Sequence, residues 1–255
     1  MSELMPSIAH NEPLVPLPTS DAELALKLAD AEWRIFSGAL YKIMVKGDDE
    51  AEEAMVMPFK PNRAQRRFIT RLWHRNLILK ARQLGFTTLI AILWLDHALF
   101  NADQRCGIIA QDRDAAKVIF RDKVKFAYTN LPEQLRERFP LEADNADELL
   151  FAHNNSSIRV ATSMRSGTIH RLHVSEFGKI CAKYPDKAQE VVTGSIPAVP
   201  TNGILVIEST AEGREGEFFN MVEHAQKLHT TKLPLTPKDY RFHFYAWWQE
   251  PKYRL

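Results

Sequence analysis

The sequence predicts an α/β protein whose core is a doubly wound, mainly parallel sheet with helices on both faces. Apolar strand-like runs alternate with helical patterns along most of the chain, which is typical of parallel sheets. Three of these runs, residues 77–79, 172–174 and 204–207, lead directly into charged or hydroxyl side chains. Because doubly wound proteins bind ligands at the carboxyl edge of the sheet, we expect the functional site where these runs end.

Length and composition exclude several protein classes. The 255 residues suffice for one large α/β domain or two small ones. Lys+Arg 33 against Asp+Glu 32 gives a formal charge of +1, so only local clusters of charge can argue for nucleic acid. The longest apolar run, residues 89–95, is interrupted by Asp96 and is far shorter than the roughly 20 residues of a membrane span. The proline-rich N-terminus lacks the apolar core of a secretory signal, and Cys106 and Cys181 stand far apart, which fits a reducing cytoplasm.

Three segments are expected along the chain: a flexible lead-in over residues 1–20, a helical segment over 21–58 and the main domain over 59–255. Four prolines fall in the lead-in. Ser20 or Asp21 can cap the first helix. In the main domain we expect strands at 105–111, 149–152, 157–161 and 240–248, and helices at 88–100, after Asp112 and at 215–228.

Residues 77–89, LILKARQLGFTTL, have the plan of a phosphate-binding loop. An apolar strand enters a basic turn with Gly85, and a long apolar helix opens on Thr87 and Thr88. In such loops backbone N–H groups and a helix N-terminus surround a polyphosphate, and a hydroxyl reaches its Mg²⁺. Thr87 is therefore the candidate Mg²⁺ ligand.

The loop departs twice from the pattern G-x-x-x-x-G-K-[ST]. Lys80 stands at the first glycine position, and Phe86 stands where the lysine is expected. The positive charge is instead earlier in the sequence, at Lys80 and Arg82. A cation there can reach the β- and γ-phosphates. The alternative is an ordinary strand-to-helix turn with basic surface residues. The candidate nucleotide-binding residues are Gln65, Lys80, Arg82, Gln83, Gly85, Phe86, Thr87 and Thr88.

A basic helix precedes this loop by about a dozen residues, in the stretch FKPNRAQRRF at 59–68. Gln65 has the paired donor and acceptor that can bind adenine, which is the preferred interpretation. Alternatively, Arg63, Arg66 and Arg67 contact DNA phosphates.

The run LHVSE at 172–176 ends in the candidate catalytic carboxylate, Glu176. P-loop ATPases end the corresponding strand in Asp-Glu, where the Asp holds Mg²⁺ through water and the Glu orients the attacking water. Here Ser175 replaces the Asp. Its hydroxyl can bind a metal-bound water but supplies no charge, so we expect weaker Mg²⁺ binding or a carboxylate from elsewhere. The alternative is a strand ending on a solvated glutamate.

Two further stretches complete the candidate site. The run ending in Ser209, Thr210 and Ala211 has the form of the element that couples γ-phosphate loss to movement in nucleic-acid translocases. Arg165, in the polar loop at 163–168, is a candidate arginine finger from the same or a neighbouring subunit, or simply a solvated side chain.

The ordered stretches FKPNRAQRRF, KARQLGFTT, RLHVSEFGK, IESTAEG and FYAWWQEPKYR resemble the ATPase domain of the large terminase subunit of tailed bacteriophages, over about residues 55–254. The resemblance implies a P-loop NTPase fold of the RecA-like (ASCE) type and a motor that hydrolyses ATP, with Mg²⁺, to drive viral double-stranded DNA into the procapsid. It implies the phosphate, catalytic and coupling roles named above, with Arg165 acting in trans.

The resemblance also implies partners: DNA, the portal protein, the small terminase subunit and other copies of the chain in a ring, within the bacterial host cytoplasm. An isolated domain is expected to be monomeric. The family's nuclease would begin near the end of this chain, so no nuclease activity is expected. Two alternatives remain open: a helicase-like DNA-dependent ATPase, and a non-enzymatic assembly subunit with a degenerate nucleotide site.

Overall fold

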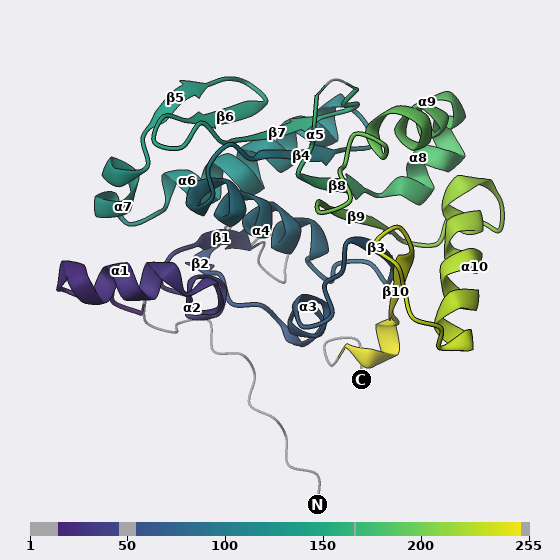
Figure 1. The fold of residues 1–255 in the computed structure, drawn as a ribbon, viewed down its shortest axis with the longest axis horizontal. Helices are drawn as coiled ribbons and strands as arrows, with labels where there is room; N and C mark the ends of the chain where they lie inside the picture. The colour runs from purple at the N-terminus through teal and green to yellow at the C-terminus, as the bar shows by residue number, and fades with distance from the viewer. Residues whose placement is uncertain (1–14, 46–54, 166, 251–255) are drawn as a thin grey trace, which may run out of the picture.

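A computed structural model describes residues 15–45, 55–165 and 167–250 (Figure 1). Most of the expected lead-in, the acidic stretch at 47–53 and the last five residues therefore lie outside the described residues. Within the described part, no helix has both the length and the apolarity that crossing a membrane requires.

An eight-stranded sheet forms the centre of the molecule. Its neighbours from β10 to β7 are parallel, and β6 and β5 are antiparallel to the strands beside them. This arrangement confirms the predicted mainly parallel sheet. In spatial order the strands are β10 (Tyr240–Tyr245), β3 (Arg75–Lys80), β9 (Ile204–Ser209), β8 (Arg171–Ser175), β4 (Arg105–Ile109), β7 (Ser157–Ala161), β6 (Glu148–Phe151) and β5 (Leu141–Asp144).

Helices cover both faces of the sheet, as predicted (Figure 1). Because side chains alternate along a strand, the neighbours Leu77 and Ile78 of β3 belong to two different cores. One core contains the apolar helix α4, and the other contains α8 and α10. The helices of the main domain are α3 (Arg63–Ile69), α4 (Phe86–Phe100), α5 (Arg113–Ile119), α6 (Phe126–Thr129), α7 (Glu133–Arg138), α8 (Phe177–Lys183), α9 (Pro185–Glu190) and α10 (Gly216–Thr231). Two π-helical segments (Phe120–Lys125 and Val191–Ser195) and a 3-10 turn (Trp247–Gln249) complete the set.

The N-terminal segment differs from the helical expectation for residues 21–58. Ser20 caps α1 (Asp21–Ala29), but the chain then breaks at Asp30, which caps a second helix, α2 (Ala31–Phe36). The strands β1 (Lys42–Val45) and β2 (Met55–Pro58) follow as an antiparallel pair. Their sequences, KIMV and MVMP, do not alternate between apolar and polar residues, so they lack the period of two that indicates a strand.

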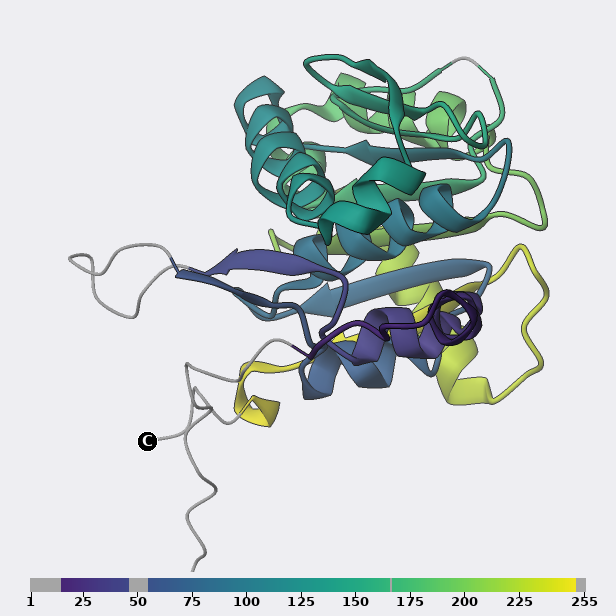
Figure 2. The ribbon, with the colours of Figure 1, turned by 90° about the vertical axis from the view of Figure 1, so that its left-hand side faces the viewer.

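Asp96, the residue that interrupts the apolar run, anchors this segment to the main domain. Arg34 of α2 donates two hydrogen bonds to its carboxylate, at 2.8 and 2.9 Å, and the Tyr41 hydroxyl donates a third at 2.7 Å. A buried charge is stable only with such partners. A second contact joins the same two parts of the chain. The Arg66 guanidinium of α3, in the main domain, lies 5.1 Å from the Phe36 ring of α2, and the two helices are neighbours in both views (Figures 1 and 2).

The aromatic stretch at 240–248 contains the edge strand β10, which pairs with β3. Phe242 and Tyr245 are buried, so the stretch packs on the core as expected. The strand ends at Tyr245, earlier than the expected 248, and Trp247 and Trp248 begin the 3-10 turn with exposed side chains.

Candidate active site

The carboxyl ends of β3, β9 and β8 form the candidate site. These strands are adjacent and parallel, with β9 between the other two. Lys80 ends β3, Ser175 ends β8, and Ser209 ends β9. Because parallel strands finish at the same edge of a sheet, side chains from all three meet there.

Lys80 lies between two carboxylates. Its Nζ is 3.0 Å from Oε1 of Glu176 and 3.0 Å from Oε2 of Glu208. The lysine side chain is only 6% exposed. Burial acts to lower the pKa of Lys80, but the charges of Glu208 and Glu176 outweigh it and raise the pKa. The lysine is therefore charged, and the structure brings together the two residues, Lys80 and Glu176, that the sequence placed at this edge.

Glu176 occupies the sharp connection between β8 and α8. Its backbone is left-handed (φ 53°, ψ 45°), which is uncommon for a residue with a Cβ and often marks a functional position. The second carboxylate oxygen, Oε2, lies 3.2 Å from Lys179 Nζ and 3.5 Å from the Thr210 hydroxyl. With Lys80 on Oε1, both oxygens of Glu176 are held in place.

Glu208 is a site residue that the sequence analysis did not select. Its side chain is fully buried (0% exposed), and its Oε1 accepts hydrogen bonds from the hydroxyls of Ser175 (2.8 Å) and Thr87 (3.2 Å). His173 Nε2 lies 3.4 Å from the same oxygen. Burial acts to raise the pKa of Glu208, but the His173 contact, the Lys80 charge and the Ser175 hydroxyl lower it to about 2. Glu208 is thus an ionised, buried carboxylate at the centre of the cluster.

The loop between β3 and α4 has the expected shape. Gly85 precedes α4 with a left-handed backbone (φ 70°), which favours glycine, and a Cβ there would stand 2.8 Å from Gln65 Nε2. Thr87 is in the first turn of the helix, where its hydroxyl also lies 3.4 Å from that of Ser175. Arg82 and Gln83 are exposed, and Thr88 is half-buried.

Gln65 supports this loop through both halves of its side-chain amide. Its Oε1 accepts from the backbone N–H of Asn62 in a capping box. Its Nε2 donates to the carbonyls of Gly85 at 2.9 Å and Leu84 at 3.4 Å. Both halves of the amide are therefore occupied, and reading of adenine would require the amide to exchange these partners.

Phe86 is a core residue, which corrects its assignment as a nucleotide-binding side chain. The ring is 1% exposed and lies 5.8 Å from the Phe68 ring and 4.8 Å from the Tyr245 ring. Position 86 therefore points away from the phosphate loop and into the protein, and a lysine there would be buried. This packing explains why the loop has its cation at Lys80, before Gly85, and not at position 86.

The variant Phe86→Lys restores the lysine of the standard phosphate-loop pattern. We expect it to unfold the protein rather than to strengthen nucleotide binding. Loss of the buried ring alone costs about 3–5 kcal/mol, and burial of an unpaired ammonium adds to this cost. Urea denaturation followed by circular dichroism measures the effect, with Phe86→Leu as the apolar control of smaller cost. A Phe86→Lys protein as stable as the wild type would contradict the buried placement.

Arg165 is distant from this cluster in the same chain. It is exposed and forms an ion pair with Glu190 of α9. It also lines a cavity with Arg105 and His170, which lie at the opposite, amino-terminal ends of β4 and β8. This placement does not favour a role as an arginine finger within one chain, and the role across a subunit interface stays a prediction.

The coupling residues differ in their surroundings. Thr210 contacts Glu176, as described, and its hydroxyl also donates to Glu212 at 3.2 Å. Ser209 is fully buried next to Gly178, where a Cβ would approach the serine hydroxyl to 2.8 Å. Ala211 is exposed. Of the three, Thr210 has direct contact with the predicted catalytic carboxylate.

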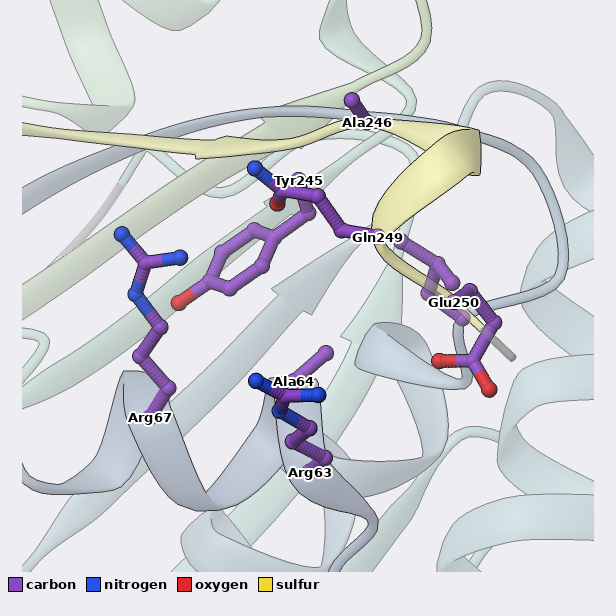
Figure 3. Close-up of a pocket in the computed structure, with 8 residues that line it drawn as sticks. Arg63, Ala64, Arg67, Tyr245, Ala246, Gln249 and Glu250 are labelled. Carbon is purple, nitrogen blue, oxygen red and sulfur yellow. The ribbon is translucent and has the colours of Figure 1, made fainter. Parts of the chain in front are cut away.

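The arginines of α3 have separate environments. Arg66 donates to the Pro61 carbonyl at 2.8 Å and packs on Phe36, which is a structural role. Arg63 and Arg67 line a cavity of about 250 Å³ next to the phosphate loop. Figure 3 shows the Arg67 guanidinium beside the Tyr245 ring, 5.8 Å from its centroid.

The oxygen atoms of the cluster fit Mg²⁺. Thr87 and Ser175 present hydroxyls, and Glu208 presents a carboxylate, all within 3.4 Å of one another. Mg²⁺ prefers oxygen ligands and is commonly held by one or two carboxylates together with substrate phosphates and water. Over the described ranges, no group of three or more His, Cys, Asp or Glu side chains makes a metal site by itself.

Comparison with known proteins gives a match in structure alone. No family model and no curated protein matches the sequence. The large terminase ATPase domain of Thermus phage P74-26 superposes with a TM-score of 0.54 at 17% identity, over 75% of this chain and 83% of that chain. A mutant of the same domain gives a TM-score of 0.49 at 16% identity, over 74% and 81% of the two chains. The chain therefore has the fold of a phage large terminase ATPase domain, a P-loop NTPase fold.

Proposed function

We propose that the protein binds Mg·ATP at the carboxyl edge of the sheet and hydrolyses it. The observation that carries this proposal is the placement of Lys80, which lies between Glu176 and Glu208 directly before a glycine turn that opens a long helix. Backbone N–H groups of the loop and the N-terminus of α4 can surround the phosphates. Lys80 and Arg82 supply the positive charge that Phe86 cannot.

The side chains at this edge have different roles in the proposed hydrolysis of ATP. Glu176 orients the attacking water and accepts its proton. Thr87 and Ser175 offer oxygens to Mg²⁺, which when bound neutralises charge on the β- and γ-phosphates. Lys80 Nζ lies 3.0 Å from Glu176 Oε1. An incoming triphosphate offers Lys80 a stronger anionic partner, so nucleotide binding releases Glu176 for catalysis.

Thr210 is the proposed coupling contact. Its hydroxyl lies 3.5 Å from the Glu176 carboxylate and directly follows β9. A change in Glu176 when the γ-phosphate leaves can therefore pass to Thr210 and then to the loop containing Ala211. Ser209, which is buried behind it, would fix the end of the strand.

The cellular role that we propose is packaging of double-stranded DNA into a phage procapsid. It rests on the shared fold and on the motif order in the sequence. In this role the chain would act at the portal with the small terminase subunit, as a ring in the host cytoplasm. Because Arg165 is exposed and remote from its own Glu176 cluster, we propose that it approaches the nucleotide of a neighbouring subunit.

The nucleobase is proposed to occupy the cavity lined by Arg63, Arg67, Leu84 and Tyr245. Leu84 belongs to the phosphate loop, so the cavity lies within reach of a nucleotide bound there. An aromatic ring and a guanidinium are suitable partners for the face of a purine. Gln65 then acts by holding the loop, not by reading the base.

Removal of both arginines, with Arg63→Ala and Arg67→Ala together, is expected to weaken nucleotide binding about 10-fold through lost stacking. Titration of a fluorescent ADP analogue measures it, with the exposed Arg113→Ala of α5 as a control. If these arginines contact DNA phosphates instead, the double variant would keep its nucleotide affinity. Its DNA affinity would then fall, with a flatter dependence on salt.

The proposed function is tested by phosphate release from Mg·ATP, measured with and without double-stranded DNA and with EDTA as the blank. We expect turnover that needs Mg²⁺ and that DNA stimulates. Nucleotide binding without turnover in the presence of DNA would favour an assembly subunit over an enzyme. A protein that binds no Mg·ATP at all would contradict the proposal.

A further inference from the structure

Ser175 leaves the site without a charge at the position where P-loop ATPases carry an aspartate. Mg²⁺ binds oxygen ligands, and a neutral hydroxyl attracts it far less than a carboxylate does. The candidate site therefore needs a negative charge close to Ser175 and Thr87. The sequence motifs alone do not say where it comes from.

Glu208 stands directly opposite Ser175 on the neighbouring strand. In the parallel pair β8–β9 the two residues are register partners, and such partners place their side chains on the same face of the sheet. One oxygen of Glu208 accepts from both the Ser175 and Thr87 hydroxyls, at 2.8 and 3.2 Å. The missing charge is thus present at the same place, carried by the adjacent strand.

The balance of charge also requires a cation for Glu208. Its side chain is fully buried, and Lys80, at 3.0 Å, is the cation beside it. If Lys80 moves to the phosphates when nucleotide binds, Glu208 would remain as a buried carboxylate without its lysine, which is strongly unfavourable. A divalent cation entering with the nucleotide would replace that charge.

We propose that Glu208 supplies the negatively charged ligand for Mg²⁺, directly or through a metal-bound water, in place of the residue at position 175. This inference rests on the proposed function, because it assumes that Mg·nucleotide binds at this edge. The competing interpretation is that Glu208 is only a structural counter-ion for Lys80. The two interpretations differ in what Glu208 does to metal affinity.

The test measures Mn²⁺, as a spin probe for Mg²⁺, by electron paramagnetic resonance in the presence of a non-hydrolysable ATP analogue. Glu208→Gln is expected to weaken Mn²⁺ binding by at least about 10-fold. The exposed Glu215→Gln, which removes the same charge a few residues away, is the matched control and should leave Mn²⁺ affinity unchanged.

A variant that moves the carboxylate makes the test specific. Ser175→Asp combined with Glu208→Gln returns the charge to β8, and we expect it to restore Mn²⁺ affinity to within a few-fold of the wild type. If Glu208→Gln does not fold, Glu208→Asp replaces it in the test. This variant keeps the charge on a side chain that is one methylene shorter, so the carboxylate lies farther from the metal. We expect it to bind Mn²⁺ more weakly than the wild type.

The failures of the two proposals can be told apart. Wild-type Mn²⁺ affinity in Glu208→Gln, or in Glu208→Asp if that variant must be used, would overturn the role of Glu208 and leave the ATPase proposal standing. A wild-type protein that binds neither the analogue nor Mn²⁺ would overturn both.

Discussion

Glu176→Gln is expected to reduce ATP turnover by about 10²–10⁴-fold, the usual contribution of a positioned general base. The amide keeps the shape of the side chain but cannot accept the proton of the attacking water. Binding of Mg·ATP should be retained, or become tighter, because Lys80 loses a competing anion 3.0 Å away. Steady-state phosphate release and nucleotide titration measure the two effects separately.

The matched control for this variant is Lys179→Met. Lys179 contacts the other oxygen of Glu176, at 3.2 Å. The variant therefore tests whether loss of a neighbouring charge, with the carboxylate itself kept, is enough to slow turnover. We expect a much smaller loss for Lys179→Met than for Glu176→Gln. Turnover that Glu176→Gln leaves unchanged would discard the enzymatic assignment.

Lys80→Met is expected to abolish measurable nucleotide binding and to destabilise the fold by about 3–5 kcal/mol, the usual cost of removing one partner of a buried ion pair. Glu208 would remain fully buried beside an apolar side chain. Urea denaturation gives the free energy of unfolding, and calorimetric titration with Mg·ATP gives the affinity.

The double variant Lys80→Met with Glu208→Gln separates the two effects. Removal of both charges should recover most of the lost stability, because no buried carboxylate is left unpaired. It should not recover nucleotide binding. A Lys80→Met protein with wild-type stability would contradict the ion pair with Glu208, and one with wild-type affinity for Mg·ATP would contradict the role of Lys80 in the loop.

Much of the fold could be predicted because it depends on local patterns. The apolar run before Lys80, the glycine at 85 and the apolar helix after it have the signatures of strand, turn and helix, and the structure has β3, the loop and α4 there. The order of the strands could not be predicted in this way. That β9 lies between β3 and β8 depends on pairing between segments about 30 and 125 residues apart, which no local pattern specifies.

The site could be predicted in part for the same reason. Lys80 and Glu176 each end an apolar run, and the edge rule for parallel sheets brings them together. Gln65 is predicted to bind adenine from its amide group and its position ahead of the loop, and Phe86 is predicted to bind nucleotide from its place at the lysine position of the motif. Capping and core packing, however, determine what their side chains contact. Glu208 was missed because its importance comes from its register with Ser175, a relation between two strands.

The most direct test of the account is a crystal structure with Mg²⁺ and a non-hydrolysable ATP analogue. We expect the γ-phosphate within hydrogen-bond distance of Lys80 Nζ, the loop before Gly85 around the β-phosphate, and Glu176 released from Lys80. An analogue bound away from the ends of β3 and β8, with Lys80 still between Glu176 and Glu208, would contradict it.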